Sequence, residues 1–286
     1  MSGGGTTLIQ PGATANLAVA STAALSGRMF ENGGTVLFSG AGALTVNSSA
    51  VITNRVGALF QVANEAPSGL GNSANGRFDN AGIFRKSAGT GTTTIASGLN
   101  FTNFGTVDIR SGILKANGAY ASRSNALLNC ALGGPIAGTN YGQLQVSGTV
   151  NLNGGLSVDL LPGFSPQTND SFTVLNAGTR SNAFTSFSYP SNRVTLLLSN
   201  STTSVILRVT DVLPIPPPVL LTPQLAGSNA LIAWTATSNV TYRLEFSPGL
   251  TNWSALAGDV TTLSNTASKL DPLTSSNRFY RVRVLP

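Results

Sequence analysis

The sequence lacks histidine altogether and has a single cysteine among its 286 residues. Without histidine, Ser-His-Asp and Cys-His nucleophiles, histidine-ligated zinc and histidine acid–base catalysis are excluded. One cysteine cannot form an internal disulfide or an all-thiolate zinc site. We expect Cys130 to be a small buried hydrophobic residue, because no histidine can activate its thiol. The residues therefore point to no cofactor and no metal, and only carboxylate chemistry is left.

Charge is scarce as well. Only 9% of the residues are charged, against about a quarter in an average soluble domain. The 16 basic and 10 acidic residues give a net charge of +6, but they form no basic block. The densest basic stretch, Arg278 to Arg283, alternates arginine with apolar residues as the outer face of a strand does. This pattern predicts no nucleic-acid partner.

Long apolar runs are missing too. No run reaches the ~18 residues that a membrane-spanning helix needs, so no membrane span is predicted. Residues 1–7, MSGGGTT, lack the basic and apolar regions of a secretory signal. Either the chain stays inside the cell or its native start lies further upstream, and we expect the second because the opening residues already resemble the middle of a repeat.

Polarity comes instead from hydroxyls and amides. Serine and threonine occur 32 times each, asparagine 26 times and glycine 32 times. Threonine and β-branched residues favour strands, glycine, asparagine and serine favour turns, and the helix-favouring lysine, glutamate and glutamine are few. The composition predicts an all-β protein.

One phrase recurs in the first half of the chain: a large apolar residue, an asparagine two positions later, and a glycine soon after. Copies begin at Phe30, Phe78 and Phe101, with a looser one at Ile52, at intervals of 22, 26 and 23 residues. A fixed period of this length predicts a β-solenoid in which each copy is one coil. Hairpins in a β-sandwich also give short strands with glycine and asparagine turns, but they predict no fixed phrase at fixed spacing.

Each position of the phrase has a physical reason. The apolar residue is expected to stack on its counterpart about 4.8 Å along the axis. We expect the asparagine to take a left-handed corner conformation and to bond the same amide in the next coil as a ladder. The glycine is expected to permit the turn.

Four regions follow from the pattern. Residues 1–142 are predicted to form solenoid coils, and 143–211 the terminal coils and cap. Residues 212–218, VLPIPPP, form a stiff proline-rich linker. Residues 219–286 contain about six short strands, which we expect to form a small β-sandwich.

Two segments resemble known families. Residues 142–158, GQLQVSGTVNLNGGLSV, with the phrase repeats, resemble the end of autotransporter-type β-helix passengers, which are bacterial surface and secreted proteins. This resemblance implies a right-handed β-solenoid. Trp234, Tyr242 and Tyr280, with the strings YRLE, LTNW and FYRV, resemble a fibronectin type III-like sandwich. The chain stops at Pro286, just after what would be the penultimate strand, so the last strand is absent or lies outside this sequence.

Three residues are candidate ligand contacts. Glu31 and Asp79 follow the apolar residue of their coils, with Thr53 between them, so the register predicts them about 10 Å apart. A carbohydrate-cleaving site needs two carboxylates about 5–10 Å apart, although solvated surface carboxylates fit the same pattern. Trp253 is the candidate aromatic contact, whereas Trp234 is expected in the core.

A polar patch is also expected on neighbouring coils. Arg85 and Lys86 should lie beside Asp108 and Arg110, either as a patch for an acidic sugar or as a surface salt-bridge cluster. The salt-bridge cluster is the simpler interpretation.

We therefore expect a non-enzymatic bacterial cell-surface or secreted structural protein, an adhesin-like β-helix stalk with a C-terminal binding or anchoring module. Its partners would be a surface or extracellular polysaccharide or another surface protein. The alternative is a carbohydrate-active β-helix enzyme or a polysaccharide-binding protein. A third hypothesis, a phage-fibre-like segment, predicts a stable trimer.

Overall fold

The computed structural model of the protein describes residues 1–63, 69–71, 75–273 and 277–285. The described residues form strands and no helix, which confirms the predicted all-β class. They divide into two compact units. The solenoid unit comprises residues 1–159, 168–190 and 196–210, and the C-terminal unit comprises 160–167, 191–195 and 211–286.

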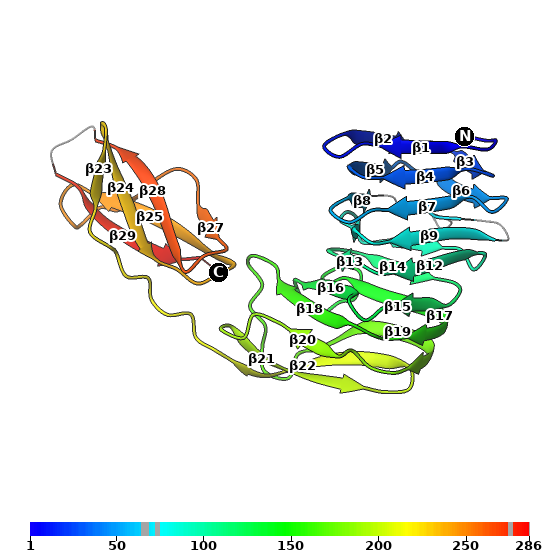
Figure 1. Ribbon diagram of the computed structural model, residues 1–286. Helices are drawn as coiled ribbons and strands as arrows, with labels where there is room; N and C mark the ends of the chain where they lie inside the picture. Colours follow the sequence, from blue (N-terminus) through cyan, green and yellow to red (C-terminus); the bar gives the residue numbers. More distant parts are fainter. Residues whose placement is uncertain (64–68, 72–74, 274–276, 286) are drawn as a thin grey trace. The chain divides into compact units, whose positions relative to one another are not determined.

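The solenoid is a stack of coils whose strands form columns of parallel pairs (Figure 1). The first column runs β1 (Thr6–Ile9), β4 (Met29–Asn32), β7 (Val51–Asn54), β9 (Gly76–Asn80), β12 (Leu99–Asn103), β15 (Tyr120–Ser122), β17 (Gln143–Asn151) and β19 (Ser171–Ser181). The second runs β2 (Thr14–Ala18), β5 (Thr35–Ser39), β8 (Leu59–Val62), β10 (Ile83–Lys86), β13 (Thr106–Ile109), β16 (Leu127–Leu132), β18 (Gly155–Leu160) and β20 (Ser186–Ser188).

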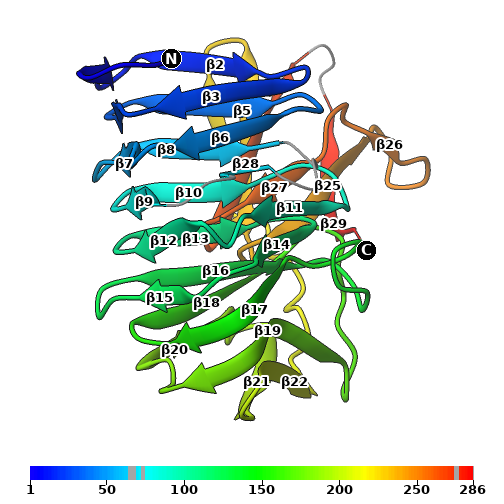
Figure 2. The ribbon, with the colours of Figure 1, turned by 90° about the vertical axis from the view of Figure 1, so that its right-hand side faces the viewer.

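A third face completes each coil. It contains the pair β3 (Thr22–Ser26) and β6 (Ala43–Asn47), and further along the pair β11 (Thr92–Ile95) and β14 (Ile113–Ala116). Single parallel bridges from Leu44 to Leu70 and from Leu70 to Ile95 connect the two pairs. β14 pairs with β17, so this face merges with the first column lower in the stack (Figure 2).

Alternation along each strand separates the interior from the surface. In β5, Val36 and Phe38 are fully buried while their neighbours are partly exposed. Period-two alternation places every second side chain on one face of a strand, so each coil contributes its apolar residues to one continuous core.

The predicted stack of large apolar residues is confirmed. Phe30 is in register with Ile52, Ile52 with Phe78, and Phe78 with Phe101. The rings of Phe78 and Phe101 lie 5.3 Å apart. Such aromatic contacts add about 0.5–1.5 kcal/mol to the free energy of burial.

The predicted asparagine ladder is also confirmed. Asn32, Asn54, Asn80 and Asn103 are fully buried. In each of the three steps the amide nitrogen donates to the next asparagine's carbonyl oxygen at 2.8 Å. The same nitrogens also donate to main-chain carbonyls of the next coil, as Asn54 does to Ile83 at 3.0 Å. The ladder thereby satisfies polar groups that burial alone would penalise by ~1–3 kcal/mol each.

The expected left-handed conformation of these asparagines is wrong. They end the strands β4, β7, β9 and β12, and none has a positive φ. The following glycine lies in the expected turn: Gly57 has a φ of 80° in a turn, and Gly34, Gly82 and Gly105 lie in bends between two strands. Close packing of the coils adds a second requirement. A Cβ on Gly82 would lie 2.4 Å from the carbonyl oxygens of Arg55 and Ala58. Glycine is needed because consecutive coils approach too closely there for any side chain.

The two ends of the solenoid differ. At the first coil, β1 and β2 each pair on one side only, and residues 1–27 carry no charged side chain. An apolar hollow of about 120 Å³, lined by residues such as Leu17, Leu25 and Leu44, opens there. At the other end, β19 pairs antiparallel with β22 (Ser204–Val212), which lies beside β21 (Val194–Asn200).

The C-terminal unit contains two antiparallel sheets. One is formed by β23 (Gln224–Ala226), β24 (Asn229–Thr235) and β28 (Thr266–Pro272). The other is formed by β25 (Val240–Ser247), β26 (Ser254–Ala255), β27 (Val260–Thr262) and β29 (Phe279–Val284). This arrangement is consistent with a small sandwich.

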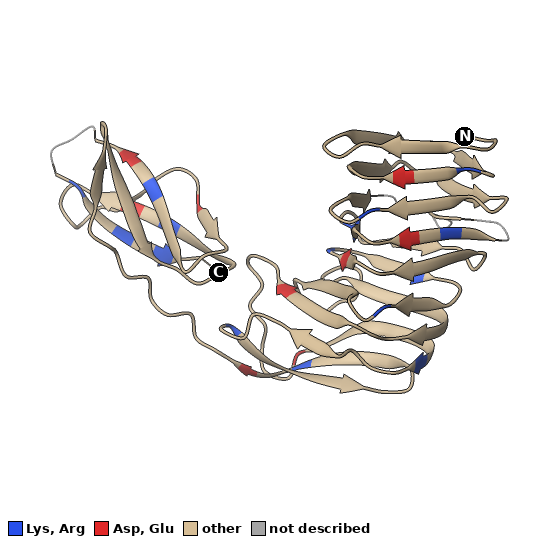
Figure 3. Cartoon of the chain, in the orientation of Figure 1, with Lys and Arg blue, Asp and Glu red and all other residues tan. Residues whose placement is uncertain are grey.

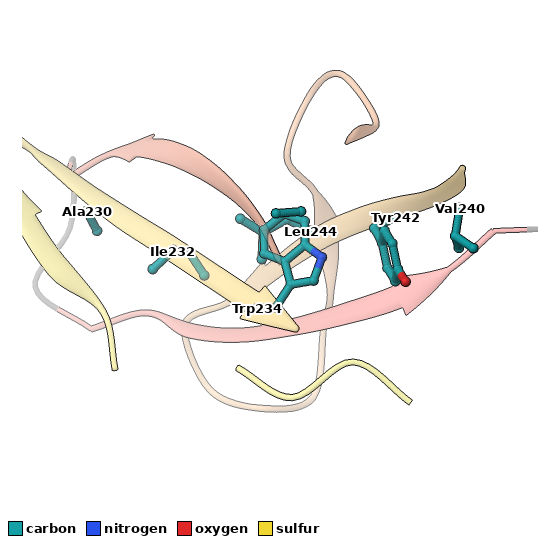
Figure 4. Close-up of a cluster of buried hydrophobic side chains, with 7 residues drawn as sticks. Ala230, Ile232, Trp234, Val240, Tyr242 and Leu244 are labelled. Carbon is teal, nitrogen blue, oxygen red and sulfur yellow. The ribbon is translucent and has the colours of Figure 1, made fainter. Parts of the chain in front are cut away.

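The core of this unit lies between the two sheets. Ile232 and Trp234 from β24 and Tyr242 and Leu244 from β25 are fully buried and point into the same interior (Figure 4). The Tyr242 hydroxyl accepts a hydrogen bond from the Thr237 amide at 2.7 Å. Trp234 is thus a core residue, as predicted.

Candidate functional site

Glu31 and Asp79 lie in the register that the repeat predicts. Glu31 is opposite Thr53, and Thr53 is opposite Asp79. Two strand spacings separate the two carboxylates, about 10 Å. Charged side chains of the solenoid are spread over several strands (Figure 3).

Each of these carboxylates has its own arginine. Arg55 pairs with Glu31, and the Arg77 Nε lies 2.7 Å from the Asp79 carboxylate. Both pairs are partly exposed on the outer surface of the first column. The arrangement is two separate ion pairs rather than two bare carboxylates facing each other.

A denser polar cluster lies on the second column, and we call it the Asp108 cluster. Asp108 is only 3% exposed. Its Oδ2 accepts from the Nε of Arg85 at 2.7 Å and of Arg110 at 3.0 Å. Its Oδ1 accepts from the Asn129 amide at 2.9 Å. The Asn129 nitrogen also donates to Asp159 at 3.0 Å, and Arg110 reaches Asp159 at 3.5 Å.

Register between coils explains the cluster. Arg85 is opposite Asp108, and Asp108 is opposite Asn129. The predicted salt bridges of Asp108 with Arg85 and Arg110 are therefore present. Sequence reasoning missed Asn129 and Asp159, since β16 and β18 carry no copy of the phrase. The strand alternation in those segments was the available signal, but it left the register open.

The expected position of Lys86 in this patch is wrong. Lys86 is fully buried, and its Nζ donates to the Ala88 carbonyl at 3.0 Å. It alternates with Arg85 along β10 and so lies on the opposite face of the strand. A Cβ on Gly112 would lie 2.5 Å from its Cε, so a glycine provides the space for the lysine stem.

The Asp108 cluster leaves its outer side chains open for binding. Both Asp108 oxygens already accept charge-assisted or amide hydrogen bonds from protein groups. Arg110 and Asp159 are each 40% exposed. Those two side chains could contact a polar ligand while Asp108 holds the arginines in place.

Cys130 lies beside this cluster and is fully buried. Burial, with a smaller contribution from the nearby Asp108 and Asp159 carboxylates, raises the pKa of its thiol far above the ordinary value. The thiol therefore stays protonated and is a poor nucleophile.

Trp253 lies in the C-terminal unit near an ion pair. The Arg281 guanidinium stacks 4.5 Å from the centre of its ring and donates to Glu245 at 2.5 Å. Arg283, which is 60% exposed, lies 3.6 Å from the same carboxylate. One face of the indole is thus occupied by Arg281, so Trp253 is part of a cation–π and ion-pair network.

A second charged network of this unit centres on Asp271, which is buried. It accepts from the Arg278 guanidinium at 2.5 Å and from the Tyr280 hydroxyl at 2.8 Å. Burial, together with the bond to Asp271, raises the pKa of Tyr280 to about 12. The network links β28 to β29 across the two sheets.

Within the described ranges, no group of three or more Asp, Glu or Cys side chains is arranged to hold a metal ion. The same residues contain no helix long and apolar enough to cross a membrane. Comparison of the sequence with protein-family models and with curated proteins finds no match.

Proposed function

We propose that this chain is a non-enzymatic bacterial cell-surface or secreted structural protein, adhesin-like in character. Its solenoid would serve as a stalk and its C-terminal unit as a binding or anchoring module. The observation that carries this proposal is the solenoid itself, in which a phenylalanine stack and a buried asparagine ladder continue from coil to coil. Such repeats build length and an extended surface rather than an enclosed pocket.

The state of the acidic residues supports the proposal. Seven carboxylates are held in ion pairs with arginine: Glu31, Asp79, Asp108, Asp159, Glu245, Asp259 and Asp271. A catalytic carboxylate must be able to contact the substrate at hydrogen-bond distance, whereas these carboxylates are held by neighbouring arginines. The pairing suits a structural surface better than a hydrolytic site.

The resemblances extend the proposal. Autotransporter-type β-helix passengers and small fibronectin type III-like modules are parts of bacterial surface proteins, and this chain would have the same combination. On this proposal it acts outside the cell, and its affinity comes from strand faces.

Localisation tests this proposal. Antibody raised against the purified chain is applied to intact and permeabilised source cells, with protease treatment of intact cells as the control. We expect antibody labelling of intact cells, or antigen in the culture medium. Antigen that is detected only after permeabilisation and survives the protease would contradict the proposal.

The alternative, a carbohydrate-active protein, has one observation in its favour. Asp108 and Asp159 both bond the Asn129 nitrogen, which places their nearest oxygens at most about 6 Å apart, within the range used by glycosidases. Release of reducing ends from acidic and neutral polysaccharides is the assay. We expect none, and activity lost in Asp159→Asn, or in Glu31→Gln with Asp79→Asn, would establish the alternative instead.

A further inference from the structure

A polar hollow on the solenoid has no part in the networks described above. It has a volume of about 220 Å³ and is lined by Lys115, Gln145, Val146, Ser147, Asn176 and Ala177. Its residues come from β14, β17 and β19, which are hydrogen-bonded neighbours at the lower end of the stack (Figure 2).

The hollow lies where β17 turns a corner. Gln143–Val146 pairs with β14, whereas Val150 and Asn151 pair with β15 on the neighbouring face. Between Val146 and Thr149 the register with β19 shifts by one residue. Such a bulge bends a strand, and the bend leaves space beside Val146 and Ala177, whose side chains are buried in the solenoid interior.

Three polar side chains cross the hollow in one row. Lys115 is in register with Gln145, and Gln145 with Asn176. Strands are about 4.8 Å apart, so the row runs along the solenoid axis for roughly 10 Å. A ligand that follows the row would be elongated and perpendicular to the strands.

Lys115 is the cation of this row. Among the described residues no carboxylate lies within ion-pair distance of its ammonium. The other two lysines of the chain are engaged: Lys86 is buried, and Lys269 donates to main-chain carbonyls such as those of Leu256 and Ala257. The Lys115 ammonium thus has three donors available for an anion.

The neighbouring amides suit hydroxyl groups. The Gln145 nitrogen donates to Gln143 at 2.7 Å, and the Gln143 nitrogen donates to the Thr173 carbonyl at 2.6 Å. This chain orients Gln145 with its carbonyl oxygen left to accept from a ligand. Asn176 is exposed and offers both a donor and an acceptor.

We propose that this hollow binds a carboxylate-bearing sugar unit of an acidic polysaccharide. Lys115 binds the carboxylate, and Gln145 and Asn176 bind hydroxyls. The hollow is smaller than the roughly 300–1,000 Å³ of pockets that enclose a whole ligand, so it takes one unit of a chain that continues along the strand face. This inference deepens the proposed surface function but is tested separately from it.

Calorimetric titration of the full chain with hexagalacturonate, and with neutral cellohexaose, tests the proposal. We expect the acidic oligosaccharide to bind and its affinity to fall with added salt. Lys115→Gln keeps the length of the side chain but removes the charge, and should weaken binding tenfold or more. Arg123→Gln, which removes a charge from an exposed side chain elsewhere on the solenoid, should leave the affinity within twofold.

Chemical labelling gives a second readout. Reductive methylation should modify Lys115 readily, and hexagalacturonate should protect it. The proposal is overturned if hexagalacturonate fails to bind, if Lys115→Gln binds as the unaltered chain does, or if Arg123→Gln loses as much affinity as Lys115→Gln. Because the titration uses purified protein, these results are independent of where the chain is located in the cell.

Discussion

The solenoid and the C-terminal unit bury polar groups in different ways. In the solenoid, asparagine side chains bond one another from coil to coil. In the C-terminal unit, buried polar side chains bond separate local partners, as the Tyr242 hydroxyl does with the Thr237 amide, and the buried Trp234 Nε1 has no hydrogen-bond partner among the described residues. A repeat can therefore share stability over many equivalent contacts, whereas a small sandwich-like unit depends on a few large side chains.

Charged groups are distributed differently in the two units. The first 27 residues of the solenoid carry no charged side chain. In the coils that follow, the ion pairs of Glu31 and Asp79 are partly exposed, whereas Asp108 is buried. The C-terminal unit has two buried carboxylates, Glu245 and Asp271, that connect strands distant in sequence. Buried carboxylates therefore join neighbouring coils in one unit and the strands of antiparallel sheets in the other.

Removing the largest core side chain should have the largest effect. Trp234→Ala leaves a cavity between the two sheets and should destabilise the C-terminal unit by about 3–5 kcal/mol. Trp253 then reports unfolding of this unit by fluorescence, while far-ultraviolet circular dichroism reports the solenoid strands. Trp253→Ala is the matched control and should cost much less. Equal losses in both signals would mean that the units do not unfold separately.

The second-largest loss of stability is expected from breaking the asparagine ladder. Asn54→Ala leaves the Asn32 donor and the Asn80 acceptor without this partner in a buried site, which should cost about 2–4 kcal/mol. Denaturant unfolding followed by circular dichroism measures the loss. Asn100→Ala, on the exposed face of β12, is the control and should cost under about 0.5 kcal/mol. A similar loss in both variants would show that the ladder adds no stability.

Alkaline pH should weaken the C-terminal unit through Tyr280, and it should weaken the solenoid as well, because burial also raises the pKa of Tyr120 and Tyr141. The pKa of Tyr280 is raised in the folded chain to about 12, above its unfolded value of about 10. Its contribution to stability is complete below the unfolded pKa and disappears as pH rises from about 10 to 12. We expect Trp fluorescence to show easier unfolding of the C-terminal unit in this window. Tyr280→Phe should flatten this dependence, and an unchanged pH profile in that variant would refute the assignment.

The smallest effect is expected at the exposed ion pairs. Glu31→Gln removes the partner of Arg55 on the solenoid surface, and exposed pairs contribute only about 0–1 kcal/mol. A double-mutant cycle with Arg55→Gln, measured by denaturant unfolding, isolates the coupling. A coupling above about 2 kcal/mol would show that this ion pair stabilises the solenoid more than exposed pairs ordinarily do.

Much of the solenoid was predictable because its phrase is local and periodic. The apolar residue, the asparagine and their intervals predicted the stack, the ladder and the register of Glu31, Thr53 and Asp79. The conformational role of the asparagine was predicted wrongly, since the same residue type serves both corners and ladders. Lys86 is buried. Its burial was missed because a charged residue in a strand is ordinarily expected to face solvent.

The sequence by itself determined the all-β class, the coil period, and which side chains fill the solenoid, because alternation and repetition are properties of neighbouring residues. Only the tertiary structure decided that Asp108, Asn129 and Asp159 meet, and that a bulge in β17 opens the hollow at Lys115. Those features depend on the register between strands and on where a strand bends. Both are set by packing between coils, which no local pattern encodes.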